Sequence, residues 1–103
     1  MHKTISTKVA KMLGIDISSA APIVLFFKSE NCGPCKTALP RAEGYAVEHG
    51  TELRVINISN GDPAMAVASE FGVRSMPTLI RIEGSHEVAR KLGAGFNSAF
   101  FAA

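Results

Sequence analysis

The chain has 103 residues, of which 47% are hydrophobic and 19% are charged, and its net charge is only +2. This composition supplies enough apolar side chains for a core, which excludes intrinsic disorder, and the balanced charge argues against nucleic acid as a partner. Two cysteines are too few for a multi-disulfide secreted scaffold or for a four-cysteine zinc site within one chain. The length corresponds to a single domain covering residues 1–103.

The sequence also bears on the cellular location. Three lysines interrupt the first apolar residues, so no secretory signal forms there. The longest apolar run, Ala20 to Phe27, is far shorter than the roughly 20 residues that a membrane-spanning helix needs. We therefore expect a cytoplasmic protein without a membrane partner.

The first half of the chain alternates between strand and helix patterns. Residues 3–6 favour a short edge strand, and residues 7–13 have helical spacing that Gly14 ends. The continuous apolar run Ile23 to Phe27 is typical of a central strand that is covered on both faces. From Cys35 to His49, small and apolar residues recur on one helical face, and Pro40 predicts a kink within that helix.

The second half continues the alternation and then ends in a hairpin. The patterns predict a strand over residues 52–58, a helix over 64–71 after Pro63, a hairpin of strands over 78–82 and 86–92, and a short final helix over 97–103. A strand–helix–strand crossover implies parallel pairing, whereas the hairpin adds antiparallel pairing. The sequence thus predicts an α/β fold with a mixed central sheet and helices on both faces.

The two cysteines carry the chemistry, because they stand as Cys32-Gly33-Pro34-Cys35 between the buried strand and the following helix. Residues three apart on a helix share one face, so the two sulfurs can meet. Cys32 lies at the end of the helix where unpaired N–H groups favour an anion, hence a nucleophilic thiolate. Cys35 lies one turn further on, on the apolar face, where it is shielded and suited to resolving a mixed disulfide. The loop between the cysteines is short, so the bond gains little from chain entropy and should be reversible.

Three interpretations of the pair remain open from the residues. A fixed structural disulfide is unusual in a reducing cytoplasm. A metal half-site would supply two thiolates per chain, but no histidine has ligand spacing to them, so we expect no metal. A Cys-x-x-Cys pair beside a strand–helix–strand pattern favours a dithiol redox site.

The sequence resembles the thioredoxin family from about Ile23 to Gly93. The resemblance rests on Cys32-Gly33-Pro34-Cys35-Lys36, on Pro40, on Ser75-Met76-Pro77-Thr78 and on Gly93. It implies a three-layer α/β/α fold, with Cys32 as the nucleophile, Cys35 as the resolving thiol and Gly33 and Pro34 at the helix start.

The resemblance also implies a docking surface for substrates. Pro77 corresponds to the family's cis-proline, which exposes the backbone of Met76 for strand-like hydrogen bonds to a substrate. Met76, Pro77 and Gly93 would form an apolar surface beside the cysteine pair, together with Asn31, which stands where the family usually has tryptophan. Ordinary core packing for Met76 and a plain turn for Gly93 are the alternatives.

Phe26 is the most serious departure from the family pattern. The family usually places a buried acid there, which assists deprotonation of the second cysteine, and Val55 stands where the partner lysine is usual. Loss of both is self-consistent, because a lone buried charge would be costly. We expect Cys35 to lose its proton to water or to a side chain such as Glu30, which predicts slow resolution of mixed disulfides.

The tail is short as well, since residues 97–103 give about two helical turns where the family has a longer helix. Arg81 falls in a strand that should be covered. We expect the short tail to leave this face partly wet, so that Arg81 reaches water, or snorkels to it.

Together these residues predict a protein-disulfide reductase that cycles between dithiol and disulfide without a bound cofactor. The expected partners are disulfide-containing proteins as substrates and, by resemblance, a thioredoxin reductase as electron donor. Nothing in the sequence requires more than a monomer. A binding module with incidental redox activity, a dithiol metal-binding protein and a glutathione-dependent enzyme are the alternatives.

Overall fold

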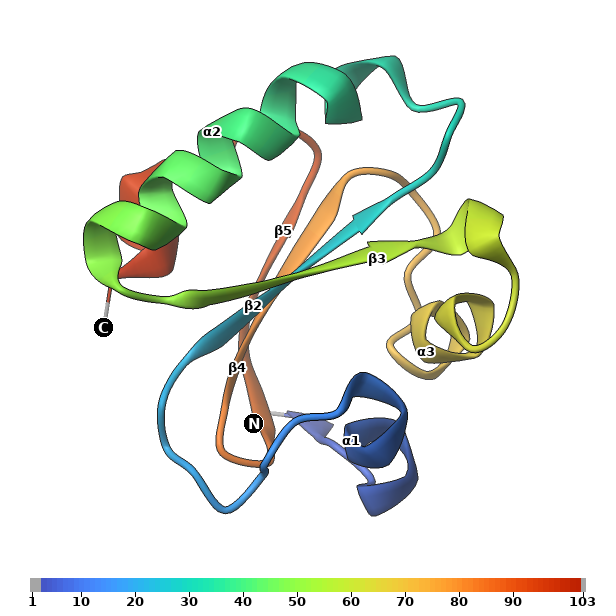
Figure 1. Cartoon of the computed structure of the whole chain (residues 1–103), viewed down its shortest axis with the longest axis vertical. Helices are drawn as coiled ribbons and strands as arrows, with labels where there is room; N and C mark the ends of the chain where they lie inside the picture. The colour runs from blue at the N-terminus through green and yellow to red at the C-terminus, as the bar shows by residue number, and fades with distance from the viewer. Residues whose placement is uncertain (1–2, 103) are drawn as a thin grey trace.

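The computed structural model describes residues 3–102, which form a mixed sheet between two helical layers (Figure 1). The order of the strands in the sheet is β1-β5-β4-β2-β3. The elements in chain order are β1 (Lys3–Thr4), α1 (Thr7–Leu13), β2 (Ile23–Lys28), α2 (Gly33–His49), β3 (Glu52–Asn57), the 3-10 turn η1 (Ile58–Asn60), α3 (Ala64–Glu70), β4 (Thr78–Glu83), β5 (His86–Leu92) and the 3-10 turn η2 (Ser98–Phe101).

Strand β2 lies inside the sheet, as its apolar run predicts. It pairs in parallel with β3 and antiparallel with β4, and the residues from Val24 to Phe27 are fully buried. Strand β4 continues into β5 through the hairpin at Gly84. The short β1 pairs with the start of β5, so it lies at the opposite edge of the sheet from β3.

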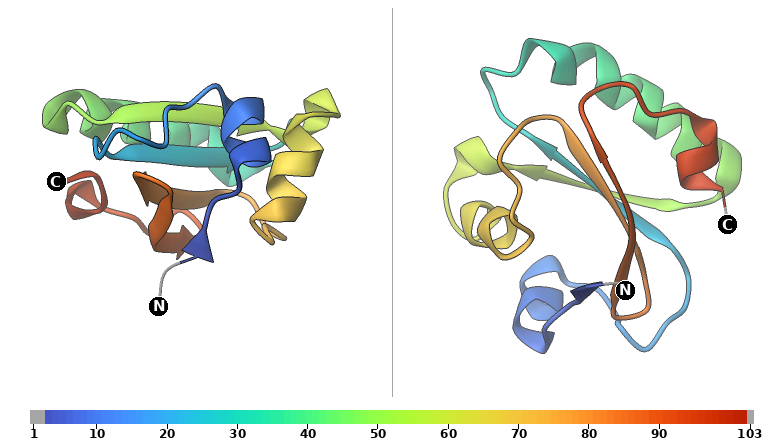
Figure 2. Two further views of the ribbon diagram at one scale, coloured as in Figure 1. Left: turned by 90° about the horizontal axis from the view of Figure 1, so that it is seen from below. Right: turned by 180° about the vertical axis from the view of Figure 1, so that it is seen from behind.

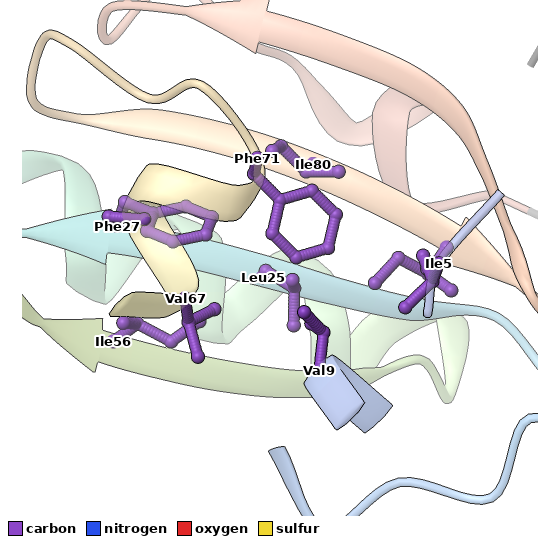
Figure 3. Close-up of a cluster of buried hydrophobic side chains, with 10 residues drawn as sticks. Ile5, Val9, Leu25, Phe27, Ile56, Val67, Phe71 and Ile80 are labelled. Atoms are coloured by element: carbon purple, nitrogen blue, oxygen red, sulfur yellow. The ribbon is translucent and has the colours of Figure 1, made fainter. Parts of the chain in front are cut away.

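Each face of the sheet has its own core. Helices α1 and α3 cover one face through an apolar cluster (Figure 3) that contains Val9, Leu25, Phe27, Val67 and Phe71. Helix α2 and the tail with η2 cover the other face (Figure 2). The α/β architecture with a mixed sheet and helices on both faces is therefore confirmed.

The element bounds differ from the prediction by only a residue or two. Strand β3 ends at Asn57, because Ile58 already belongs to the 3-10 turn that follows. Helix α3 ends at Glu70, before Phe71. The predicted helix of residues 7–13 is confirmed, with Gly14 at φ 66° as its C-cap. Helix α2 runs without interruption through Pro40. Within residues 3–102, no helix is long and apolar enough to cross a membrane.

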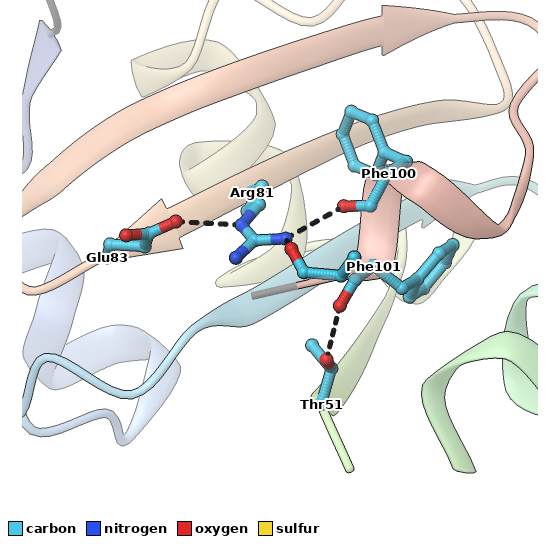
Figure 4. Close-up of polar contacts among 6 residues, drawn as sticks. Thr51, Arg81, Glu83, Phe100 and Phe101 are labelled. Carbon is cyan, nitrogen blue, oxygen red and sulfur yellow. Dashed lines mark hydrogen bonds and ion pairs between the residues drawn. The ribbon is translucent and has the colours of Figure 1, made fainter. Parts of the chain in front are cut away.

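The predictions for the C-terminal segment were wrong in two respects. The expected two-turn helix is a single 3-10 turn, η2, which the Asn97 side chain caps by accepting from the Ala99 N–H, and Ala103 lies outside the described residues. Arg81 does not reach water, because its side chain is only 7% exposed. It instead donates hydrogen bonds to the carbonyls of Phe100 and Ala102 and pairs with Glu83 (Figure 4). The segment after β5 therefore covers the arginine.

Candidate active site

The two cysteines lie at the N-terminal end of α2, where they form a disulfide with a Cα–Cα distance of 5.3 Å. Cys32 is the N-cap residue, and its Sγ accepts a hydrogen bond from the Cys35 N–H at 3.1 Å. Gly33 is the first helical residue, and Pro34 follows in the first turn, where a missing N–H costs no helical bond. The fold therefore brings one sulfur to the helix N-terminus, where partial positive charge favours a thiolate.

The two cysteine residues differ in their exposure. Cys32 retains 8% of its surface and Cys35 only 2%, so both are shielded and Cys32 is the more accessible of the two. Both belong to the apolar cluster beneath α2, which also contains Phe26, Ala38 and Leu79. A partner can therefore approach Cys32 more directly than Cys35.

The apolar cluster that contains the cysteines has an aromatic side chain, Phe26, at the position where the family usually has a buried acid. Phe26 is completely buried and packs edge-on against Phe96, with ring centroids 6.5 Å apart. Among the described residues, the buried polar or charged ones are Thr51, Thr78 and Arg81, so no buried carboxyl group lies beneath the pair. Deprotonation of Cys35 must therefore use an acceptor outside this core.

Glu30 is the nearest acid in sequence, but it is exposed, and one of its carboxylate oxygens is bonded to another side chain. Its Oε1 accepts a hydrogen bond from the Asn57 side chain at 2.7 Å, and its backbone N–H donates to the Ser59 hydroxyl. Val55 pairs with Phe26 across the sheet and is 44% exposed. Neither position supplies an acid or a lysine to the core around Cys35.

The loop before β4 lies beside the cysteine cluster. The Met76–Pro77 peptide bond is cis, as the family resemblance implies, and Pro77 is buried. Met76 is half-buried and packs against the cluster that contains both cysteines. The Gly93 N–H donates to the Pro77 carbonyl at 2.8 Å, and Gly93 has a φ of 85° that favours glycine. Three of the four predicted docking residues thus come together, and exposed Asn31 precedes Cys32 in the chain.

Sequence reasoning missed the support that the tail gives to α2. Arg41 donates hydrogen bonds to the carbonyls of Ala94 at 2.5 Å and Phe96 at 3.3 Å, and its guanidinium lies 4.4 Å from the Phe96 ring centroid. Tyr45 packs against the rings of Phe96 and Phe101. These contacts join residues about fifty positions apart, so no local pattern indicates them. They hold Phe96 and Phe101 in the apolar cluster that also contains Cys35.

The described residues contain no group of three or more histidine, cysteine, aspartate or glutamate side chains that could hold a metal ion. Cys32 and Cys35 are bonded to each other as a disulfide at this site. Two thiols near each other and a disulfide that can form between them provide a two-electron redox couple.

Comparison with known proteins agrees with this geometry. Residues 5–102 match the family model for thioredoxin, which extends the resemblance beyond residues 23–93 at both ends. The chain is 33% identical to a thioredoxin of Haemophilus influenzae over 94 residues, which cover 91% of this chain and 87% of the relative. It is also similar to a thioredoxin structure from Fasciola hepatica, with a TM-score of 0.68 and 30% identity over 81% of this chain and 76% of the other.

A third relative joins two activities in one chain. It is the bifunctional thioredoxin reductase/thioredoxin of Mycobacterium leprae, which is 35% identical over 91 residues, or 88% of this chain and 20% of that protein. Fold, cysteine pair and relatives all agree, and the chain belongs to the thioredoxin family of thiol–disulfide oxidoreductases.

Proposed function

We propose that the chain reduces disulfides in other proteins, with Cys32 as the nucleophile and Cys35 as the resolving thiol. The Cys32 thiolate attacks one sulfur of the target disulfide, and the other target sulfur leaves as a thiolate. Cys35, having lost its proton, then attacks the sulfur of Cys32 in the mixed disulfide. The target gains two electrons and is released as a dithiol, and the cysteine pair loses two electrons and becomes a disulfide.

The difference between the two sulfurs carries this assignment of roles. Cys32 is the N-cap of α2 and receives the Cys35 N–H at 3.1 Å, which stabilises charge on its sulfur. Cys35 is 2% exposed and lies against the apolar cluster, so an external disulfide reaches it less easily. The more exposed cysteine is thus the one placed where a thiolate is favoured.

The substrate docks, in this proposal, on the surface that Asn31, Met76 and Gly93 form with the exposed residues of the Cys-Gly-Pro-Cys turn, while buried Pro77 holds Gly93 from below through its carbonyl. The loop of Met76 packs against the cysteine cluster, and Gly93 is bound to Pro77, which supports one continuous surface. A substrate segment adds there in an extended conformation and bonds to the backbone of Met76.

Electrons for the next cycle come from a thioredoxin reductase. The bifunctional relative, whose name combines that activity with thioredoxin, supports this pairing. A reducing compartment such as the cytoplasm would keep the pair in its dithiol form. Residues 1–103 act as one domain in this cycle and bind no cofactor.

Reduction of insulin disulfides by dithiothreitol tests the proposal. The wild-type chain should accelerate the precipitation of the insulin B chain, and Cys32→Ser should abolish the acceleration. Cys35→Ser should instead accumulate a mixed disulfide between Cys32 and insulin. An inactive wild-type protein with two intact thiols would contradict the proposal.

Phe26 favours one second candidate, a binding module whose redox activity is incidental. The aromatic core lacks an acid that would accept the Cys35 proton, and Asn31 replaces the usual tryptophan of the docking surface. A Cys32→Ser variant that still binds a target with unchanged affinity would support this candidate. If Cys32→Ser no longer binds the target stably, the result supports the disulfide reductase.

A further inference from the structure

Strand β3 leaves one edge of the sheet open. Among residues 3–102, β2 is the only strand that pairs with β3, and β1 lies at the far edge beyond β5 (Figure 2). An edge strand presents unpaired N–H and C=O groups, and proteins commonly protect such edges with proline or a bulge. Glu52–Asn57 contains no proline, and its register with β2 is continuous. Its main chain is therefore available to another strand.

Apolar side chains lie exposed beside this edge. Val55 is 44% exposed, and Val47 on the adjoining part of α2 is 84% exposed. With Leu53 and Ala46 they line an open hollow of about 590 Å³ on the α2 face of β3. Burial of apolar surface of this kind favours association. The edge thus offers both main-chain hydrogen bonds and an apolar contact.

The charges on the other face of β3 identify the occupant. Glu52 and Arg54 point to the same face, because they are two residues apart, and they form an ion pair with each other. In a two-fold antiparallel pair of β3 strands, the axis passes through a residue that faces its own copy. With the axis at Leu53, Glu52 of each chain lies opposite Arg54 of the other. With the axis at Arg54, two arginines would face each other, which is destabilising.

We propose that β3 pairs antiparallel with β3 of a second copy of this chain, in the register centred on Leu53. Leu53 then packs against its own copy on the α2 face, with Val55 and Val47 beside it. The two sheets become one continuous sheet. The monomer expected from the sequence is then the species present at low concentration.

This interface leaves the cysteine pair free. Leu53 pairs with Val24 near the start of β2, whereas the cysteines follow the end of β2 at Lys28. The axis of the dimer therefore lies at the other end of the sheet from the site. Self-association and disulfide reduction are separate properties, and an experiment can contradict one without the other.

Sedimentation equilibrium from about 1 µM to about 1 mM measures the association. The wild-type chain should form dimers reversibly in this range. Glu52→Arg places arginines opposite arginines, and Arg54→Glu places glutamates opposite glutamates, so each variant alone should weaken dimerisation by at least about tenfold. An equimolar mixture should form heterodimers, because every cross-strand pair is then of opposite charge.

Arg54 also donates to the carbonyls of Leu13 and Gly14, so Arg54→Glu could weaken the dimer by disturbing the fold. A second variant, at a side chain without hydrogen bonds, separates the two effects. Val55→Lys introduces a charge at the interface and should likewise weaken the dimer. Met65→Lys is the matched control, because Met65 is 56% exposed on α3 and should leave association unchanged. A wild-type chain that stays monomeric at about 1 mM, or a dimer that Val55→Lys leaves intact, would overturn the proposal.

Discussion

Replacement of Arg81 by methionine tests how the contacts of residues 100–102 stabilise the fold. The guanidinium donates to the carbonyls of Phe100 and Ala102 and pairs with Glu83, while its own side chain is 7% exposed (Figure 4). Methionine keeps much of the side-chain volume but removes all of these hydrogen bonds. The carbonyls of the tail then lose their charged donor.

The magnitude follows from burial. A hydrogen bond to a charged group contributes about 1.5–3 kcal/mol, and Glu83 regains water because it is 42% exposed. We therefore expect Arg81→Met to lower the free energy of unfolding by about 3 kcal/mol. This loss is smaller than the roughly 5 kcal/mol that removal of one partner from a fully buried ion pair can cost. For a chain of this size, that loss corresponds to a fall in Tm of about 12 °C or more.

Urea unfolding followed by circular dichroism measures this loss. Glu83→Gln is the control, since Glu83 is half-exposed and glutamine keeps an oxygen that accepts from Arg81, so this change should cost less than about 1 kcal/mol. Thr51→Val removes only the hydroxyl that donates to the Phe101 carbonyl at 2.7 Å, and it should cost about 1 kcal/mol. A loss below about 1 kcal/mol for Arg81→Met would refute the conclusion that the arginine holds the tail.

Three further substitutions test the site. Phe26→Asp should speed the resolution of mixed disulfides, because it supplies a proton acceptor. It should also destabilise the fold by about 3–5 kcal/mol, because the Phe26 ring is completely buried. An unchanged resolution rate in stopped-flow measurements on the folded variant would contradict the role given to this position. Glu30→Gln should leave that rate within about twofold, because the carboxylate is held by Asn57; a tenfold or larger fall would make Glu30 the base. Met76→Lys should raise the KM for insulin more than it lowers kcat, and an unchanged KM would place docking elsewhere.

Most of the fold could be predicted because its signals are local. The apolar run of β2 specified a buried central strand, and Gly14 and Gly50 ended α1 and α2 in the left-handed conformation that they favour. The cysteine pair could be placed for the same reason, since its spacing and the following helix are contiguous in the chain. The cis bond before Pro77 came only from resemblance, because most X–Pro bonds are trans.

The errors came from contacts between distant segments. Arg81 was expected to reach water because nothing near it in sequence indicates that the carbonyls of residues 100 and 102 cover it. The bonds from Arg41 to the tail join positions more than fifty residues apart. Strand β1 pairs with β5, which leaves β3 at the open edge of the sheet. This pairing could not be predicted either, because a strand of two residues is too short to specify a distant partner.

Alkylation of the fully reduced protein tests the division of roles between the sulfurs most directly. Brief treatment with iodoacetamide at neutral pH, followed by mass spectrometry of the peptides, gives a separate rate for each cysteine. We predict that Cys32 reacts at least about tenfold faster than Cys35 and faster than free cysteine. Equal rates at the two positions, or a Cys32 no more reactive than the free amino acid, would contradict the account.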